Sequence, residues 1–193
     1  MTTIGEVWLP GVTHEPSPNA DERPAGGDID LLVIHNISLP PGEFGGPYIS
    51  DLFLNRLDPT SHPYFGEIAN LEVSAHLLVR RDGSVVQFVA LDRRAWHAGQ
   101  SDFCGRERCN DFSIGIELEG TDDQPYSEAQ YRHLALLTRH IQDLFPAITA
   151  QRIVGHSDIA PGRKTDPGPG FSWARYRTLL ASLAADRTHI TAT

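Results

Sequence analysis

Short apolar runs separated by polar loops fill the first two thirds of the chain. The run Ile29–Ile34 is rich in β-branched residues and ends at His35, a pattern that is typical of a buried strand. Two further strand-like runs flank Asp82-Gly83, a residue pair that favours a tight hairpin turn. The segments FSIGIELEG (112–120) and RIVGH (152–156) have the same character. We therefore expect a sheet built from short strands.

Helical patterns are interleaved with these strands. Pro47 suits the first turn of a short helix. An amphipathic pattern over 127–145 predicts a longer helix, and Ser127 and Gln130 have the spacing of a capping box at its start. The segment FSWARYRTLLASLAA (171–185) predicts a closing helix.

Strands and helices that alternate in this way indicate one mixed α/β domain. Residues 1–28 are rich in Pro, Gly, Asp and Glu, so we expect them to form an irregular N-terminal arm. The domain would then span 29–185, and 186–193 would be a polar C-terminal tail. With 193 residues the chain is long enough for one substantial core.

Composition and charge exclude several classes of partner. The formal net charge is -9, which argues against the basic face that a nucleic acid or an anionic membrane would require. No apolar run approaches the length of a membrane span, and the N-terminus has no signal-peptide pattern. Cys104 and Cys109 are the only cysteines, which fits a reducing compartment. We therefore expect a soluble, cytoplasmic protein without a nucleic-acid or membrane partner. We also expect a monomer, although these observations do not reveal the oligomeric state.

Four polar residues mark the candidate chemistry. His35 and His156 close apolar runs, Glu117 lies late in another, and Asp166 follows His156 after a short loop. Sites gather where strands end, and two histidines with one carboxylate leave a fourth position for water, as in catalytic zinc sites. The spacing alone does not bring these groups together. Each histidine has the alternative use of a hydrogen-bonded structural residue, and Asp166 could simply start a turn.

Lys164 is the only lysine of the chain and lies between His156 and Asp166. Every other position of the Lys/Arg type in the sequence is arginine. A lysine at this one position therefore indicates a need for a compact ammonium donor, which a guanidinium cannot replace. An ordinary solvated surface lysine is the alternative. The middle of the chain also concentrates arginines, which suit either a small anionic ligand or surface ion pairs: Arg80, Arg81, Arg93, Arg94, Arg106 and Arg108.

Five strings resemble one known family: VIHNISLPPGEFGGP, VSAHLLVRRDG, RAWHAG, GRERCNDFSIGIELEGTD and GHSDIAPGRKTDPGP. They are similar to the 1,6-anhydro-N-acetylmuramyl-L-alanine amidases (AmpD type) of bacterial cell-wall recycling. These are zinc N-acetylmuramoyl-L-alanine amidases related to peptidoglycan recognition proteins. The similarity runs from Trp8 to the last helix. It implies a central mixed sheet flanked by helices and cleavage of the amide between the lactyl group of anhydromuramic acid and L-alanine of a muropeptide.

The resemblance also implies roles for the candidate residues. His35, His156 and Asp166 occupy the Zn²⁺ ligand positions. Glu117 occupies the position of the general base and acid that acts on a zinc-bound water nucleophile, and Lys164 the position that stabilises the oxyanion.

Four more residues match positions that meet the substrate. Asn36, Trp96 and His97 correspond to pocket residues, and Arg108 corresponds to a residue that meets a peptide carboxylate. A soluble anhydro-muropeptide is therefore the expected ligand.

Three other functions remain open at this level. Some relatives of this fold have lost the metal ligands and therefore bind cell-wall fragments without cutting them, and the full set of candidate residues argues against that function here. A secreted or phage-type amidase would act on intact wall instead. A purely structural zinc would need a fourth protein ligand, and the sequence offers none that pairs obviously with this set.

Overall fold

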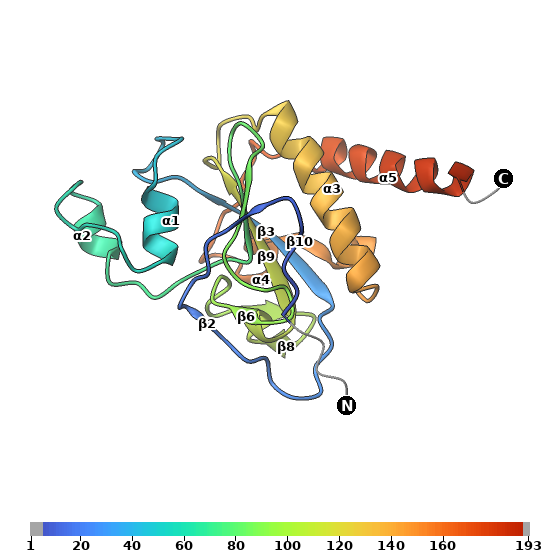
Figure 1. The fold of residues 1–193 in the computed structure, drawn as a ribbon, viewed down its shortest axis with the longest axis horizontal. Coiled ribbons are helices and arrows are strands. Elements are labelled where there is room, and N and C mark those ends of the chain that lie inside the picture. Colours follow the sequence, from blue (N-terminus) through green and yellow to red (C-terminus); the bar gives the residue numbers. More distant parts are fainter. Residues whose placement is uncertain (1–5, 191–193) are drawn as a thin grey trace.

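A six-stranded mixed sheet forms the centre of the protein, and Figure 1 shows helices around it. The structure is a computed structural model that describes the backbone of residues 6–190 and the side chains of residues 6–183. The strand order is β1-β5-β4-β9-β3-β10. In that order the strands are Thr13–His14, Val85–Gln87, Leu77–Val79, Ser113–Glu119, Leu31–Ile37 and Ile153–Gly155. β4, β9, β3 and β10 are parallel, whereas β5 is antiparallel to β4, so the predicted mixed sheet is confirmed.

The other elements surround this sheet. Two small antiparallel pairs join β2 (Ala20–Asp21) with β6 (Arg94–Ala95) and β7 (Asp102–Phe103) with β8 (Arg106–Glu107). The helices are α1 (Tyr48–Phe53), α2 (Phe65–Ile68), α3 (Glu128–Leu144), α4 (His156–Ile159) and α5 (Trp173–Ile190). Two 3₁₀ turns, η1 (Cys109–Asp111) and η2 (Ala150–Arg152), complete the set.

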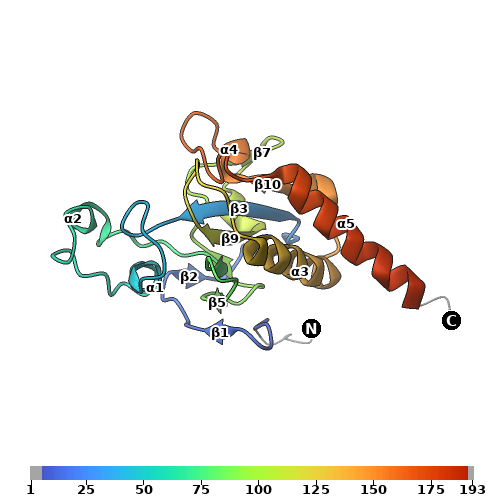
Figure 2. The same ribbon diagram turned by 90° about the horizontal axis from the view of Figure 1, so that it is seen from above.

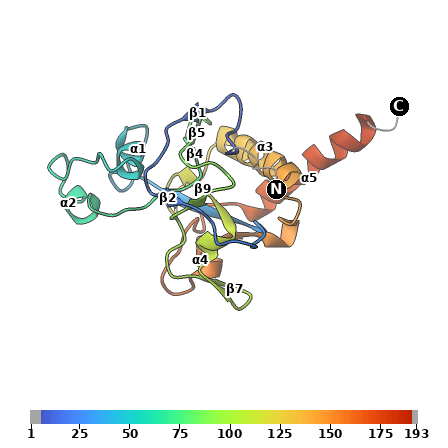
Figure 3. The same ribbon diagram turned by 60° about the horizontal axis from the view of Figure 1, so that its bottom comes forward.

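The two faces of the sheet have different covers. Figure 3 shows α3 and α4 on opposite sides of β3 and β9. Leu32 and Ile34 of β3 point into the core beneath α3 and α5, whereas Leu31 and Val33 belong to a smaller cluster with Ile159 of α4. This alternation is the period-2 pattern of a strand that is buried on both faces. α1 and α2 lie at one end of the molecule, and the last turns of α5 project from the other (Figure 2).

Several local predictions are confirmed. The hairpin β4–β5 turns at Asp82-Gly83, and α1 begins directly after Pro47. At the start of α3 the Ser127 hydroxyl accepts from the Gln130 amide at 3.1 Å. The Gln130 side chain in turn accepts from the Ser127 amide at 3.1 Å, which completes the capping box.

Three boundaries differ from the sequence pattern. β3 continues two residues beyond His35 because it pairs with β9 as far as Ile37 and Glu119. β10 ends at Gly155, so His156 begins α4 instead of closing the strand. α5 continues to Ile190 and takes in most of the residues that the pattern assigns to a tail.

The N-terminal arm packs firmly against the sheet. β1 adds to its edge beside β5, and β2 pairs with β6. The partly buried guanidinium of Arg23 donates to the carbonyl oxygens of Ser113 at 2.8 Å and Asn110 at 3.0 Å. Burial lowers the pKa of Arg23 to about 10. Arg23 therefore ties the arm to β9 and η1.

A candidate metal centre at the strand ends

Three ligand atoms converge on one side of the sheet. The Nδ1 atoms of His35 and His156 lie 2.9 Å apart, and each lies 3.1 Å from Oδ2 of Asp166. Among the described residues this is the one group of at least three such side chains that could hold a metal ion. Both histidines are buried, with 1% and 3% of their surface exposed.

The strand order brings these ligands together. β10 and β3 are parallel neighbours with Gly155 opposite Ile34. The residues that follow them, His156 and His35, therefore lie side by side. The loop after α4 then returns Asp166 to the same point, where its carbonyl accepts from the Ser157 amide at 3.0 Å. Gly155 makes this return possible, because a Cβ there would lie 2.8 Å from Pro167.

In both histidines the ring nitrogen that faces away from Asp166, Nε2, has a protein partner that orients the imidazole. Nε2 of His156 lies 3.0 Å from the Ala98 carbonyl, and a carbonyl can only accept, so this nitrogen carries the proton. Nδ1 of His156 is then free for a metal. Nε2 of His35 lies 2.9 Å from Nδ1 of His97. Metal-binding histidines ordinarily have such outer partners, so the donor set fits a bound cation.

The acid–base states of the ligands also fit. Burial lowers the pKa of His35 to about 4, although the hydrogen bond with Asp166 opposes this shift. Burial raises the pKa of Asp166, but hydrogen bonds with His156 and His35 outweigh it and hold the pKa below its usual range. A neutral imidazole and an ionised carboxylate are the forms that bind metal.

Glu117 faces this group from the next strand. It lies opposite His35 in the pairing of β9 with β3, and its buried Oε2 has no hydrogen-bond partner. Burial, followed by the charge of Asp166, raises its pKa well above the usual value, and Lys164 opposes the rise. Glu119 shares this face of β9 but accepts from the amides of Gly45 at 2.6 Å and Arg81 at 3.0 Å. Glu117 is therefore the carboxylate that remains available for chemistry.

A hollow of about 390 Å³ opens over these residues. The three ligands, Glu117 and Lys164 line it, so the structure brings together all five residues to which the resemblance assigns metal or catalytic roles. Lys164 is exposed and approaches from the loop before Asp166. Apolar side chains form the opposite wall, which comes mainly from the segment around α1 and α2: Leu39, Leu52, Phe53, Tyr64, Ile68, Leu71 and Val73. Sequence reasoning missed this wall, because Leu52, Phe53, Tyr64, Ile68 and Leu71 lie outside the family strings and only the fold brings them near the ligands.

The predicted substrate residues have varied surroundings. Asn36 and Trp96 line the hollow, but their side chains also have protein partners. The Asn36 amide donates to Asp122 at 2.8 Å, and the Trp96 indole donates to Asp21 at 3.1 Å.

His97 and Arg108 are placed differently from those two. His97 borders the hollow, yet both of its ring nitrogens face protein groups. Arg108 lies outside it, beside a neighbouring hollow, where its side chain is 70% exposed and pairs with Asp111.

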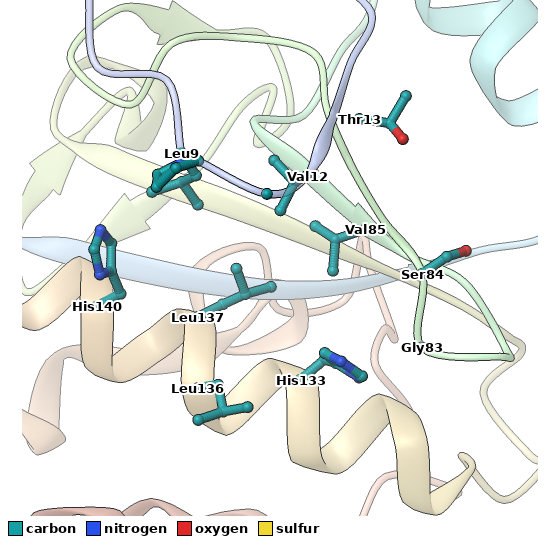
Figure 4. A pocket seen from close by; sticks show the side chains of 12 residues that line it. Leu9, Val12, Thr13, Gly83, Ser84, Val85, His133, Leu136, Leu137 and His140 are labelled. Carbon is teal, nitrogen blue, oxygen red and sulfur yellow. The ribbon is translucent and has the colours of Figure 1, made fainter.

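A second hollow lies on the face of the sheet that α3 covers, between the N-terminal arm and α3 (Figure 4). It has a volume of about 440 Å³ and an apolar lining that includes Leu9, Val12, Val85 and Leu137. The three candidate metal ligands and Glu117 do not line it, so we place the candidate site in the first hollow.

Comparisons with known proteins point to one family of amidases. The family model described as N-acetylmuramoyl-L-alanine amidase (Amidase_2) matches residues 25–169. The 1,6-anhydro-N-acetylmuramyl-L-alanine amidase AmpD of Escherichia coli is 61% identical over 178 residues, which are 92% of this chain and 97% of that protein. The corresponding Citrobacter freundii protein is 59% identical over 92% of this chain and 94% of its own length.

Solved structures give the same result. A crystal structure of a selenomethionine derivative of AmpD superimposes with a TM-score of 0.88 at 60% identity, covering 90% of this chain and 96% of that one. A more distant match is the Escherichia coli amidase AmiD in complex with the substrate anhydro-N-acetylmuramic acid-L-Ala-D-γ-Glu-L-Lys. It has a TM-score of 0.60 and 29% identity, and covers 82% of this chain and 60% of that one.

Proposed function

The chain belongs to the N-acetylmuramoyl-L-alanine amidase family and is an amidase of this kind, and on this premise we propose that it is a Zn²⁺-dependent hydrolase of soluble anhydro-muropeptides. The bond cleaved would be the amide between the lactyl group of 1,6-anhydro-N-acetylmuramic acid and L-alanine. One observation carries the proposal: an unpartnered buried carboxylate, Glu117, faces a convergent His-His-Asp group in one hollow.

His35, His156 and Asp166 would hold the metal. Two imidazoles and one carboxylate that leave a further position open are a usual donor set for catalytic zinc. When bound, Zn²⁺ would lower the pKa of a water molecule from about 15.7 to roughly 7 and polarise the amide carbonyl.

Glu117 would transfer the proton. It takes a proton from the attacking water as the water oxygen bonds to the carbonyl carbon, and it delivers a proton to the L-alanine nitrogen as the C–N bond breaks. Burial raises the pKa of Glu117 in the metal-free protein, and a bound dication would oppose that rise and favour the ionised form that accepts the water proton. Proton transfer by a positioned side chain contributes about 10²–10⁴-fold in rate.

Lys164 would stabilise the negative charge that develops on the carbonyl oxygen. It borders the hollow on the side of Asp166, and its ammonium group is a compact donor. One preorganised donor of this kind contributes about 2.7–4 kcal/mol to stabilisation of the transition state.

The apolar wall and the polar strand ends would bind the substrate between them. We assign the apolar wall to the sugar and lactyl portion and the open side near Lys164 to the peptide. The family resemblance implies a role in peptidoglycan recycling in the cytoplasm, and the AmpD relatives are named for the same anhydro-muropeptide amide. None of the helices in the described part of the chain combines the length and apolar character needed to cross a membrane.

The test is incubation of zinc-loaded protein with anhydro-N-acetylmuramyl-tripeptide, with product identification by mass spectrometry. We expect free tripeptide and anhydro-N-acetylmuramic acid, and we expect a chelator to abolish both. The Glu117→Gln variant should retain the metal and lose turnover. Intact substrate in the zinc-loaded wild-type sample would favour a binding module instead. Release of peptide from intact sacculi at a comparable rate would favour an amidase of whole wall.

A further inference from the structure

A chain of hydrogen bonds leads from one metal ligand into the protein interior. Nε2 of His35 lies 2.9 Å from Nδ1 of His97. Nε2 of His97 lies 3.1 Å from the Ser113 hydroxyl, and that hydroxyl donates to the Cys109 carbonyl at 2.6 Å. This series of hydrogen bonds therefore begins at a backbone oxygen of η1 and ends at the candidate metal site.

The direction of this chain is fixed by its inner end. A carbonyl oxygen can only accept, so the Ser113 hydroxyl donates its hydrogen to the Cys109 carbonyl. The hydroxyl oxygen then accepts from Nε2–H of His97, which leaves Nδ1 of His97 without a proton. That nitrogen accepts from Nε2–H of His35. His35 is consequently held as the tautomer whose lone pair is on Nδ1, the atom that faces His156 and Asp166.

Ala98, the residue after His97, orients the other histidine ligand, His156. The Ala98 carbonyl accepts from Nε2 of His156 at 3.0 Å, and it also accepts from Arg163 at 2.6 Å. The distance from Arg163 to His156 Nε2 itself is longer, at 3.4 Å. Two consecutive residues, His97 and Ala98, thus set the orientation of both imidazoles.

The His97–Ala98 segment is itself fixed in place. The side-chain oxygen of Asn110 accepts from the amides of His97 at 3.1 Å and Ala98 at 2.8 Å. The imidazole of His97 lies directly on β9 at Gly115, where an added Cβ would lie 2.5 Å from its Cγ. The ring therefore cannot move towards the sheet, and it can occupy this place only because residue 115 lacks a side chain.

We propose that His97 is a positioning residue, which acts through His35 and holds that ligand in its metal-binding tautomer and orientation. The inference rests on the proposed metal site and deepens it. His97 lines the hollow as the resemblance implies, but His35 and Ser113 engage both ring nitrogens, which leaves neither for a hydrogen bond with substrate. Loss of an outer partner of this kind lowers metal affinity by about 10–100-fold.

Three variants separate the possibilities. His97→Phe keeps a flat ring and removes both nitrogens. His97→Asn places an amide oxygen near the position of Nδ1, where it can still accept from His35. Ser113→Ala leaves His97 in place but removes the group that fixes its tautomer. His140→Phe makes the same exchange on the exposed face of α3 and is the matched control.

The measurements are the Zn²⁺ dissociation constant by competition with a chromophoric chelator and the imidazole tautomers by ¹⁵N NMR. We expect wild type and His140→Phe to agree, with His35 protonated at Nε2. His97→Phe should raise the dissociation constant about 10–100-fold, and His97→Asn should recover most of the loss. Ser113→Ala should shift the tautomer of His97 and weaken Zn²⁺ binding by a smaller factor.

Wild-type Zn²⁺ affinity and an unchanged His35 tautomer in folded His97→Phe would overturn the inference. If His97→Phe does not fold, an unchanged His97 tautomer in Ser113→Ala would overturn it instead. The proposed function fails in a different way, because Asp166→Ala would then bind Zn²⁺ as tightly as wild type. The two failures are therefore distinguishable.

Discussion

Gly168 and Gly162 offer a matched pair of substitutions in the loop that carries Asp166. Both have left-handed backbone conformations, with φ of +74° and +76°. A Cβ on Gly162 would meet nothing within 4 Å, whereas a Cβ on Gly168 would lie 2.6 Å from the Asp122 carbonyl oxygen and nearer still to its Cα. Alanine at either position has the same backbone cost, so the difference between the two variants isolates the steric contact.

The expected magnitudes follow from these distances. A left-handed alanine costs roughly 1–2 kcal/mol, and this cost is shared by both variants. Ordinary van der Waals contact begins near 3.4 Å, so the Asp122 backbone must retreat from Gly168→Ala by more than about 0.8 Å, because its Cα is nearer than its carbonyl oxygen. Overpacking of this kind costs about 1–3 kcal/mol. Gly168→Ala should therefore be less stable than Gly162→Ala by about 1–3 kcal/mol.

Metal affinity should also separate the pair. Asn36 donates to both Asp122 and the Pro167 carbonyl, so a displacement of residue 122 is transmitted to the neighbour of Asp166. Ligand distances tolerate changes of only about 0.2 Å, and we expect Gly168→Ala to bind Zn²⁺ roughly tenfold or more weakly.

Urea unfolding of the metal-free variants and Zn²⁺ competition measure these two effects. Equal unfolding free energies, within about 0.5 kcal/mol, and equal affinities for the pair would refute the reasoning.

Three further outcomes are expected. Lys164→Ala should keep its metal and lose about 10²–10³ in kcat, Lys164→Arg should recover only part of that loss, and near-normal turnover in Lys164→Ala would remove the proposed role. Chelation should lower the unfolding midpoint, and free Zn²⁺ at about 100 times its dissociation constant should restore about 2.7 kcal/mol to wild type but not to Asp166→Ala. Burial and the neighbouring Arg23 lower the pKa of His76 to about 3, so its unfolded form binds the extra proton as the pH falls below about 6.5. Stability should fall by up to about 1.4 kcal/mol per pH unit from this group between those values, and a slope that is unchanged in His76→Asn would contradict the assignment.

The sequence predicted the elements of this fold better than their arrangement. The strand before His35, the hairpin at Asp82-Gly83 and the capped helix after Ser127 all follow from local patterns, and the structure contains each. Local patterns do not encode strand order. The parallel pairing of β3 with both β9 and β10 is what places His35 beside Glu117 and His156, and this pairing joins segments about 80 to 120 residues apart.

The candidate site shows the same division. Residue types and family strings indicated the candidate ligands, but they could not show the directions in which side chains point. His97 lies in a string that suggests a substrate contact, and only the positions of His35 and Ser113 show that its nitrogens face inward. Arg23 lies in a stretch rich in turn residues, and its burial depends on carbonyl groups supplied by residues 91–113, so no local pattern could have revealed it.

Because Lys164 is the only lysine and borders the hollow, the protein can be labelled chemically at one known side chain. Lys164 provides the only side-chain amine in the sequence, and it is exposed beside the candidate metal ligands. An amine-reactive reagent would therefore mark one lysine peptide, and mass spectrometry could read its extent of modification directly. A ligand that occupies the hollow should shield that amine, so a simple footprinting measurement would report occupancy even when no bond is cleaved.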